Sequence, residues 1–312
     1  MRCLPQKFRA YRTAVAVASA TGLCLVGVAP ASMAQPLLGP SNTVQMRAAT
    51  TTPGQSQAAA PVRPRPYLVL GDSISAGYQP GRGDDRTGGY ARGVARGLRA
   101  AGTPVRITNL ACTGETTTTM RQGGRCRYQR GSQRAAAVAF LRANPDTAFI
   151  SVSLGANDTL ACVDRPRRTV DSRCTQRAAR TMRTNLTSTL TELRRVAPRA
   201  RIVVLDYYDP FQAGYLRGER ALGDLAGLMR TQVNVTVRGA ARDAGVRVAY
   251  VSAPFDDGWV RRVDLPGHGK VPVRVARICT WTWMCSRSDI HPNDEGYRVI
   301  AGAVLSSLTR RR

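Results

Sequence analysis

YLVLGDSISAGY, residues 67–78, sets a short apolar run directly before a glycine-bounded segment that contains Ser73. The apolar run is typical of a buried strand, and the glycines that follow it are typical of a turn. Ligand sites of parallel sheets lie at the carboxyl ends of the strands, which is where this turn would stand. The first question about function is therefore whether Ser73 is a nucleophile or an ordinary turn residue.

Four further β-rich runs follow the first at intervals that leave room for helices. The five candidate strands cover residues 67–70, 105–110, 147–154, 201–207 and 246–251. Between them apolar residues recur at helical spacing, at Met182, Leu186, Leu190 and Leu193 and again at Leu222, Leu225, Met229, Val233 and Val237. This alternation predicts an α/β fold in which a parallel sheet of about five strands carries helices on both faces.

The first 34 residues have the features of an export signal. Arg2, Lys7, Arg9 and Arg12 precede an apolar stretch over residues 14–31, and small residues stand before a cleavage point after Ala34. We predict a cleaved signal peptide over 1–34 and a secreted or cell-wall-associated protein, with an uncleaved membrane anchor as the alternative. Residues 35–65 are rich in Ala, Thr and Pro without an apolar period, which predicts a disordered linker. The folded domain is expected over 66–312.

The cysteines fit an oxidising compartment, because an even number remains once the signal is removed. They fall into pairs that are local in the sequence, and closing a short loop costs the least chain entropy. We therefore predict the disulfides Cys112–Cys126, Cys162–Cys174 and Cys279–Cys285. The chain has no C-x-x-C motif and only two histidines, so zinc is the weaker interpretation and we expect no metal and no cofactor.

The chain is strongly basic, with a formal net charge of +26 that is carried almost entirely by arginine. The arginines are scattered at the spacing of a solvated helical surface and are not interleaved with aromatic residues, so we expect no nucleic-acid partner. A basic exported protein would be attracted weakly to anionic cell-wall polymers or to a membrane surface.

A serine hydroxyl becomes a nucleophile when a base, usually histidine, lies within hydrogen-bond reach. His268 lies in PGHGK, a glycine-flanked loop, whereas His291 opens HPNDEGY, where Pro292 suits the first turn of a helix. We predict His291 as the base.

Four short blocks occur in order along the chain, the first three of them at predicted strand ends: GDSIS at 71–75, CTGET at 112–116, GAND at 155–158 and DIHPN at 289–293. Any one of them alone is more often structural. Together they resemble the blocks of the SGNH hydrolases, also called the GDSL esterase and lipase family, over residues 66–312. The paired cysteines resemble the secreted actinobacterial branch. The resemblance implies a three-layer α/β/α, flavodoxin-like domain.

The resemblance also implies a role for each block. Ser73 would be the nucleophile and His291 the base, while the main-chain N–H groups of Ser73 and Gly114 with the side-chain amide of Asn157 would form the oxyanion hole. Fixed donors of this kind stabilise the charge of a tetrahedral intermediate. Asp72 and Asp158 are expected to hold neighbouring loops through backbone hydrogen bonds.

One position departs from the family's pattern. The family usually places the aspartate of its triad three residues before the histidine, where this chain has Ser288, and Asp289 stands only two before. Either Asp289 reaches the imidazole from this shorter spacing or a main-chain carbonyl holds the ring. A Cys279–Cys285 bridge would stiffen the loop in both cases.

These features predict a secreted serine esterase or lipase that hydrolyses small-molecule or lipid carboxylic esters through an acyl-enzyme at Ser73. A carbohydrate O-deacetylase of the same fold and a catalytically inactive, basic wall-binding protein are the alternatives. The α/β-hydrolase fold is disfavoured, because its G-x-S-x-G motif needs glycine where this chain has Ser75. Trp281, Trp283 and Met284 are candidates for an acyl pocket, although aromatic residues beside a disulfide are more often core.

Overall fold

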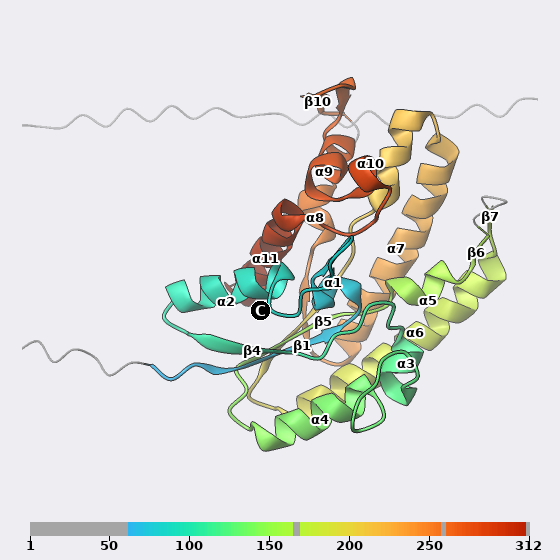
Figure 1. Cartoon of the computed structure of the whole chain (residues 1–312). Coiled ribbons are helices and arrows are strands. Elements are labelled where there is room, and N and C mark those ends of the chain that lie inside the picture. Colours follow the sequence, from blue (N-terminus) through green and yellow to red (C-terminus); the bar gives the residue numbers. More distant parts are fainter. Residues whose placement is uncertain (1–61, 165–168, 257–259, 310–312) are drawn as a thin grey trace, which may run out of the picture. The chain divides into compact units, whose positions relative to one another are not determined.

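The computed structural model describes residues 62–164, 169–256 and 260–309 (Figure 1). One parallel sheet of five strands runs through this part in the order β4-β1-β5-β8-β9. The strands are β1 Arg65–Gly71, β4 Val105–Asn109, β5 Phe149–Ser153, β8 Arg201–Leu205 and β9 Arg247–Ala249. The predicted α/β fold is thus confirmed. The predicted signal peptide and residues 35–61 of the predicted linker lie outside the described residues.

The order of the strands places a topological switch beside β1. This strand pairs with β4 on one side and with β5 on the other. After β1 the chain forms β4 on one side of it and then crosses over to form β5 on the other side. In open parallel sheets the ligand site lies at such a switch, outside the carboxyl ends of the strands. Ser73 follows β1 directly and therefore stands at this point of the fold.

Helices cover both faces of the sheet. Successive side chains of a strand point to opposite faces, so a strand that is apolar throughout needs cover on both sides. Tyr67 and Val69 belong to one core cluster, while Leu68 and Leu70 belong to the other. Figure 1 shows α2 and α11 above the sheet and α4 and α6 below it. The long helices are α2 Gly89–Ala100, α4 Gln133–Ala143, α6 Ser172–Val196, α7 Arg220–Asp243 and α11 Asp294–Thr309. The result is the three-layer arrangement that the sequence predicts.

Helix α6 illustrates how the sequence determines these layers. Met182, Leu186 and Leu190 recur at helical spacing and are fully buried against the sheet. Burying each of these side chains stabilises the fold by about 1.5–3 kcal/mol. The Asp171 side chain accepts a hydrogen bond from the Cys174 N–H and so caps the amino end of the helix.

Shorter elements gather in the connections after the strands. They are α1 Ser73–Ala76, β2 Tyr78–Gln79, β3 Gly83–Asp84, α3 Thr117–Gln122, α5 Ala156–Leu160, β6 Val163–Asp164, β7 Thr169–Val170, η1 Pro210–Arg217, α8 Ser252–Phe255, β10 Arg262–Leu265, β11 Gly269–Pro272, α9 Val273–Trp281 and α10 Met284–Arg287. The segments that follow β1, β4 and β5 carry three of the four sequence blocks.

Three disulfides join the cysteines in the predicted pairs. They are Cys112–Cys126, Cys162–Cys174 and Cys279–Cys285. The last of them connects α9 to α10, shortly before the block that contains His291. Among the described residues, no helix combines the length and the apolar character needed to cross a membrane.

Candidate active site

Ser73 is the first residue of α1 and is held at the carboxyl edge of the sheet by its neighbour. Asp72 has an extended backbone, and its Oδ1 accepts a hydrogen bond from the Ile74 N–H at 3.0 Å. This contact caps the first turn of α1, as expected of an aspartate at a helix start. Ser73 is 8% exposed, so its hydroxyl is almost enclosed.

His291 reaches Ser73 from the loop between α10 and α11. Its Nε2 lies 2.8 Å from the Ser73 Oγ, and its Nδ1 lies 2.8 Å from the Asp289 Oδ1. The structure therefore brings the three residues together, with a carboxylate rather than a main-chain carbonyl on Nδ1. His268 is exposed and lies in the turn between β10 and β11.

The backbone around Asp289 explains how the short spacing reaches the ring. Ser288 has a φ of +52°, in the left-handed region that a residue other than glycine rarely adopts. On either side of this turn, the Trp283 carbonyl accepts from the Asp289 N–H at 3.4 Å and the Trp283 N–H donates to the His291 carbonyl at 3.0 Å. The Tyr208 hydroxyl donates to the Ile290 carbonyl at 2.6 Å. These contacts fold the loop so that the carboxylate faces the imidazole.

The two remaining blocks lie next to each other beside this triad. Gly114 follows β4 with a φ of +81°, a conformation that favours glycine. Asn157 lies on α5, and its Nδ2 donates to the Glu115 carbonyl at 2.9 Å. Asp158 accepts a hydrogen bond from the Thr117 main-chain N–H at 2.9 Å, which ties α5 to α3.

Residues 69–299 match the GDSL-like lipase/acylhydrolase family. The chain belongs to this family. A GDSL-like lipase from Parabacteroides merdae superposes with a TM-score of 0.50 at 16% identity, covering 78% of this chain and 94% of that one. The lipase Lip_vut3 from a goat rumen metagenome gives a TM-score of 0.50 at 16% identity, with 78% and 97% covered. Phospholipase A1 from Streptomyces albidoflavus is 22% identical, with a TM-score of 0.47 and 78% and 100% covered. No curated protein matches the sequence.

The aspartate of the GDSL block is itself part of a buried network. The Asp72 Oδ2 accepts from the Tyr207 hydroxyl at 2.6 Å, and its Oδ1 accepts from the Ser153 hydroxyl at 3.2 Å. Burial raises the pKa of Asp72 to about 7, although these hydrogen bonds act in the opposite direction. Sequence reasoning assigned no role to Tyr207, which stands two residues after β8 and so lies at the same edge of the sheet.

A cavity of about 470 Å³ opens beside Ser73, Asn157 and His291. Its walls are mainly apolar side chains from α5, η1, α7, α10 and the loop before His291, among them Leu160, Phe211, Leu225, Met229, Val233, Met284 and Ile290. An apolar cavity of this size beside a few convergent polar groups is typical of a small-ligand site. In this GDSL-family chain the cavity adjoins the serine hydroxyl itself.

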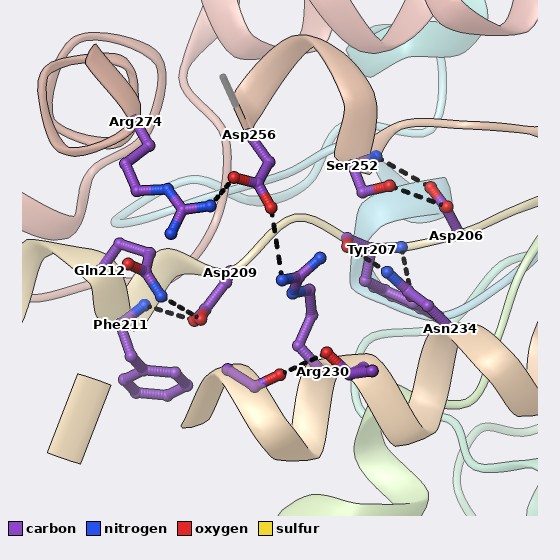
Figure 2. Close-up of polar contacts among 12 residues, drawn as sticks. Asp206, Tyr207, Asp209, Phe211, Gln212, Arg230, Asn234, Ser252, Asp256 and Arg274 are labelled. Carbon is purple, nitrogen blue, oxygen red and sulfur yellow. Dashed lines mark hydrogen bonds and ion pairs between the residues drawn. The ribbon is translucent and has the colours of Figure 1, made fainter. Parts of the chain in front are cut away.

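Figure 2 shows a cluster of polar side chains between η1, α7 and α8, of which Asp209 and Arg230 line the cavity. Asp209 is buried and accepts from the Gln212 Nε2 at 2.7 Å, and burial raises its pKa. Asp256 pairs with Arg230 at 3.4 Å and also with Arg274 (Figure 2). In this cluster the Asp256 carboxylate is shared by two guanidinium groups, those of Arg230 and Arg274.

The aromatic residues before His291 divide between core and loop. Of the three candidates for an acyl pocket, only Met284 lines the cavity. Trp281 packs edge-on against Phe255 in the core, with ring centroids 5.1 Å apart. Trp283 donates from Nε1 to the Gln79 Oε1 at 2.7 Å, which fastens the loop to the segment after α1. Neither tryptophan lines the cavity, and the favoured interpretation of these aromatic residues as core holds for Trp281.

Tyr78 is a contact of the triad that sequence reasoning missed. Its ring lies 4.4 Å from the imidazole of His291, centroid to centroid. The Tyr297 hydroxyl donates to the Tyr78 carbonyl at 3.0 Å and so fixes this segment to α11.

In the part of the chain that the structure describes, no three His, Cys, Asp or Glu side chains gather as a metal site.

Proposed function

We propose that this protein is a serine esterase or lipase that hydrolyses carboxylic esters through an acyl-enzyme at Ser73. The observation that carries the proposal is the run of contacts from Asp289 through His291 to the Ser73 Oγ, each of them 2.8 Å long. Such a run supplies a nucleophile, a base and an orienting carboxylate in one line. Membership of the GDSL-like lipase/acylhydrolase family supports the same reaction class.

In the first step the Ser73 Oγ attacks the ester carbonyl carbon while its proton passes to the His291 Nε2. The Asp289 carboxylate holds the Nδ1–H of the ring, which keeps Nε2 free to accept that proton. The tetrahedral intermediate then expels the alcohol, which takes the proton from His291. A water molecule repeats the sequence on the acyl-enzyme and releases the carboxylic acid, leaving the Ser73 hydroxyl restored.

The negative charge of each tetrahedral intermediate would be met by the N–H groups of Ser73 and Gly114 and by the Asn157 amide. Donors that are fixed before the reaction need no reorganisation as the charge develops, and each one contributes about 3–4 kcal/mol. The contact from the Asn157 Nδ2 to the Glu115 carbonyl orients the amide in this position.

The cavity favours an apolar acyl group as the substrate. Its lining residues Leu160, Met229 and Val233 would bury an alkyl chain next to Ser73, and each buried CH₂ group contributes about 0.8 kcal/mol. An acetyl group would leave most of the cavity unfilled, so esterase or lipase activity is favoured over carbohydrate deacetylation. A purely wall-binding protein would have no need of the aligned triad.

Secretion and weak attachment to anionic surfaces belong to the same proposal. The three disulfides support an oxidising compartment. The net charge of +26 supports long-range attraction to anionic wall polymers or lipid head groups, which salt would screen.

Hydrolysis of chromogenic acetate, butyrate, octanoate and palmitate esters by the wild-type protein and by Ser73→Ala tests the proposal. We expect turnover of the wild type to peak on a chain longer than acetate and to fall to the uncatalysed rate in folded Ser73→Ala. Equal rates in the two proteins across the panel would contradict the proposal.

A further inference from the structure

We infer that Gln133 is a positioning residue for the proposed reaction, because its side chain joins the loop of the nucleophile to the loop of the oxyanion donors. The inference rests on the proposed function. Gln133 is the first residue of α4 and is fully buried. It lies 62 residues from Gly71 and 18 residues from Glu115 in the sequence, yet its amide contacts both.

On the nucleophile side, Gln133 holds both backbone groups of Gly71, two residues before Ser73. The Gly71 N–H donates to the Gln133 Oε1 at 2.6 Å, and the Gln133 Nε2 donates to the Gly71 carbonyl at 3.0 Å. Gly71 leaves no room for movement toward β5, because a Cβ on it would lie 1.9 Å from the Ser153 carbonyl oxygen. Gln133 and the Cys112 N–H, which also donates to the Gly71 carbonyl at 3.0 Å, therefore hold a backbone that is already packed tightly against β5.

On the oxyanion side, Gln133 holds Glu115, the residue after Gly114. The Gln133 Nε2 lies 2.9 Å from the Glu115 Oε2, and the Glu115 side chain is buried. The main-chain carbonyl of Glu115 is the acceptor that orients Asn157. Gln133 thus holds the side chain of Glu115, and the main-chain carbonyl of Glu115 in turn holds Asn157, a proposed oxyanion donor.

A carboxamide is required at this position because the neighbours need both an acceptor and a donor. The Gly71 N–H needs an acceptor and the Glu115 carboxylate needs a donor, and a carboxamide offers both, whereas an ionised carboxylate only accepts. The Tyr128 hydroxyl, 3.1 Å from the Gln133 Nε2, completes the contacts of the amide. Glutamate would keep the bond from the Gly71 N–H, but it would lose the bond to the Gly71 carbonyl and would face Glu115 with a second carboxylate.

The effect on catalysis would come through geometry. A displacement of about 1 Å in a catalytic group can lower a rate by about 100-fold. Moving Glu115 changes the direction of the Asn157 amide, whose donor acts on the transition state rather than on the bound ester. The predicted signature is a loss in kcat with little change in KM.

The experiment compares Gln133→Glu with the double variant Glu115→Gln/Gln133→Glu, which restores a donor–acceptor pair by exchanging the two groups. Gln122→Glu, at an exposed position on α3, is the matched control, and Ser73→Ala gives the background rate. Folding of every variant is checked by circular dichroism, and kcat and KM are measured across pH on the preferred ester.

We expect Gln133→Glu to lose about 10- to 100-fold in kcat, with KM within about twofold of the wild type. The deficit should shrink toward acid pH, because a proton shared by the two carboxylates restores the missing donor. The double variant restores the bond between positions 115 and 133 but not the bond to the Gly71 carbonyl, so its kcat should lie clearly above that of Gln133→Glu. Gln122→Glu should match the wild type.

Wild-type kcat in folded Gln133→Glu, or a folded double variant as slow as Ser73→Ala, would overturn the inference. If Gln133→Glu does not fold, the double variant alone decides, since it keeps the bond from Gly71 and the bond between positions 115 and 133. Wild-type turnover in Ser73→Ala would instead show that the proposed function itself is wrong.

Discussion

Asp289 and His291 are separated by a single residue, yet the Asp289 Oδ1 lies 2.8 Å from the His291 Nδ1. The same oxygen also accepts from the His291 main-chain N–H at 2.9 Å. One carboxylate oxygen therefore holds both the ring and the backbone of the proposed base. The left-handed backbone conformation of Ser288 turns the chain so that this short loop can form.

Replacing Asp289 by alanine should lower kcat by about 10³- to 10⁴-fold, because the imidazole would lose the group that fixes its orientation and tautomer. KM should change little, since Asp289 does not line the cavity. Steady-state kinetics on the preferred ester measure both quantities. Asp264→Ala, on an exposed part of β10, is the control. Unchanged kcat in Asp289→Ala would mean that another group orients His291.

Enlarging a residue in the cavity should shift the acyl preference. Met229 lines the cavity on α7, so Met229→Trp would fill space that a longer acyl chain needs. We expect kcat/KM for octanoate to fall by about 10- to 100-fold, because the acyl chain would lose apolar contacts with the pocket that are worth about 1–3 kcal/mol. The acetate ester should be hydrolysed at nearly the wild-type rate. A uniform loss on every ester would place the acyl chain elsewhere.

Breaking the disulfide nearest the triad should destabilise the protein moderately. The Cys279–Cys285 bridge closes a loop with a sequence separation of 6. Loop-closure entropy for this length predicts a loss of about 2 kcal/mol in the free energy of unfolding for Cys279→Ser/Cys285→Ser. Urea unfolding measures the loss. An unchanged midpoint in urea would show that the surrounding contacts, and not the bridge, hold this loop.

Burial of Asp72 should make stability depend on pH. Its pKa in the folded protein, about 7, lies above the ordinary value of 3.8. The stabilisation linked to its protonation is fully present below about pH 4 and is lost as the pH rises through about 7. The Asp72→Asn side chain stays neutral at every pH. As the pH rises from about 4 to above 7, the free energy of unfolding of Asp72→Asn should therefore increase by about 2–4 kcal/mol relative to that of the wild type. Urea unfolding at several pH values tests this, and a difference that does not vary with pH would contradict it.

Much of the site was predictable because it depends on local patterns. The apolar runs located all five strands, and parallel strands end at a common edge, so Ser73, Gly114 and Asn157 were expected to meet there. Pro292 pointed to the histidine that lies against Ser73. Predicting these features requires only the spacing of apolar residues in the sequence and the topology of a parallel sheet.

The contacts that were not predictable depend on packing between distant segments. Whether Asp289 would reach the ring depended on the backbone of Ser288, which has no signature in the sequence. The two amide contacts of Gln133 join three segments that are adjacent only after folding. The placement of Trp281 was open for the same reason, because its neighbour Phe255 comes from α8.

The assignment of Ser73 as the nucleophile and His291 as its base can be tested by the reaction of the folded protein with a phosphonate ester that carries a good leaving group. Peptide mass spectrometry then locates the adduct. We expect a single adduct on Ser73 that is absent in Ser73→Ala and forms at least about 100-fold more slowly in His291→Ala, while His268→Ala reacts like the wild type. An adduct on another residue, or equal labelling rates in His291→Ala and the wild type, would contradict it.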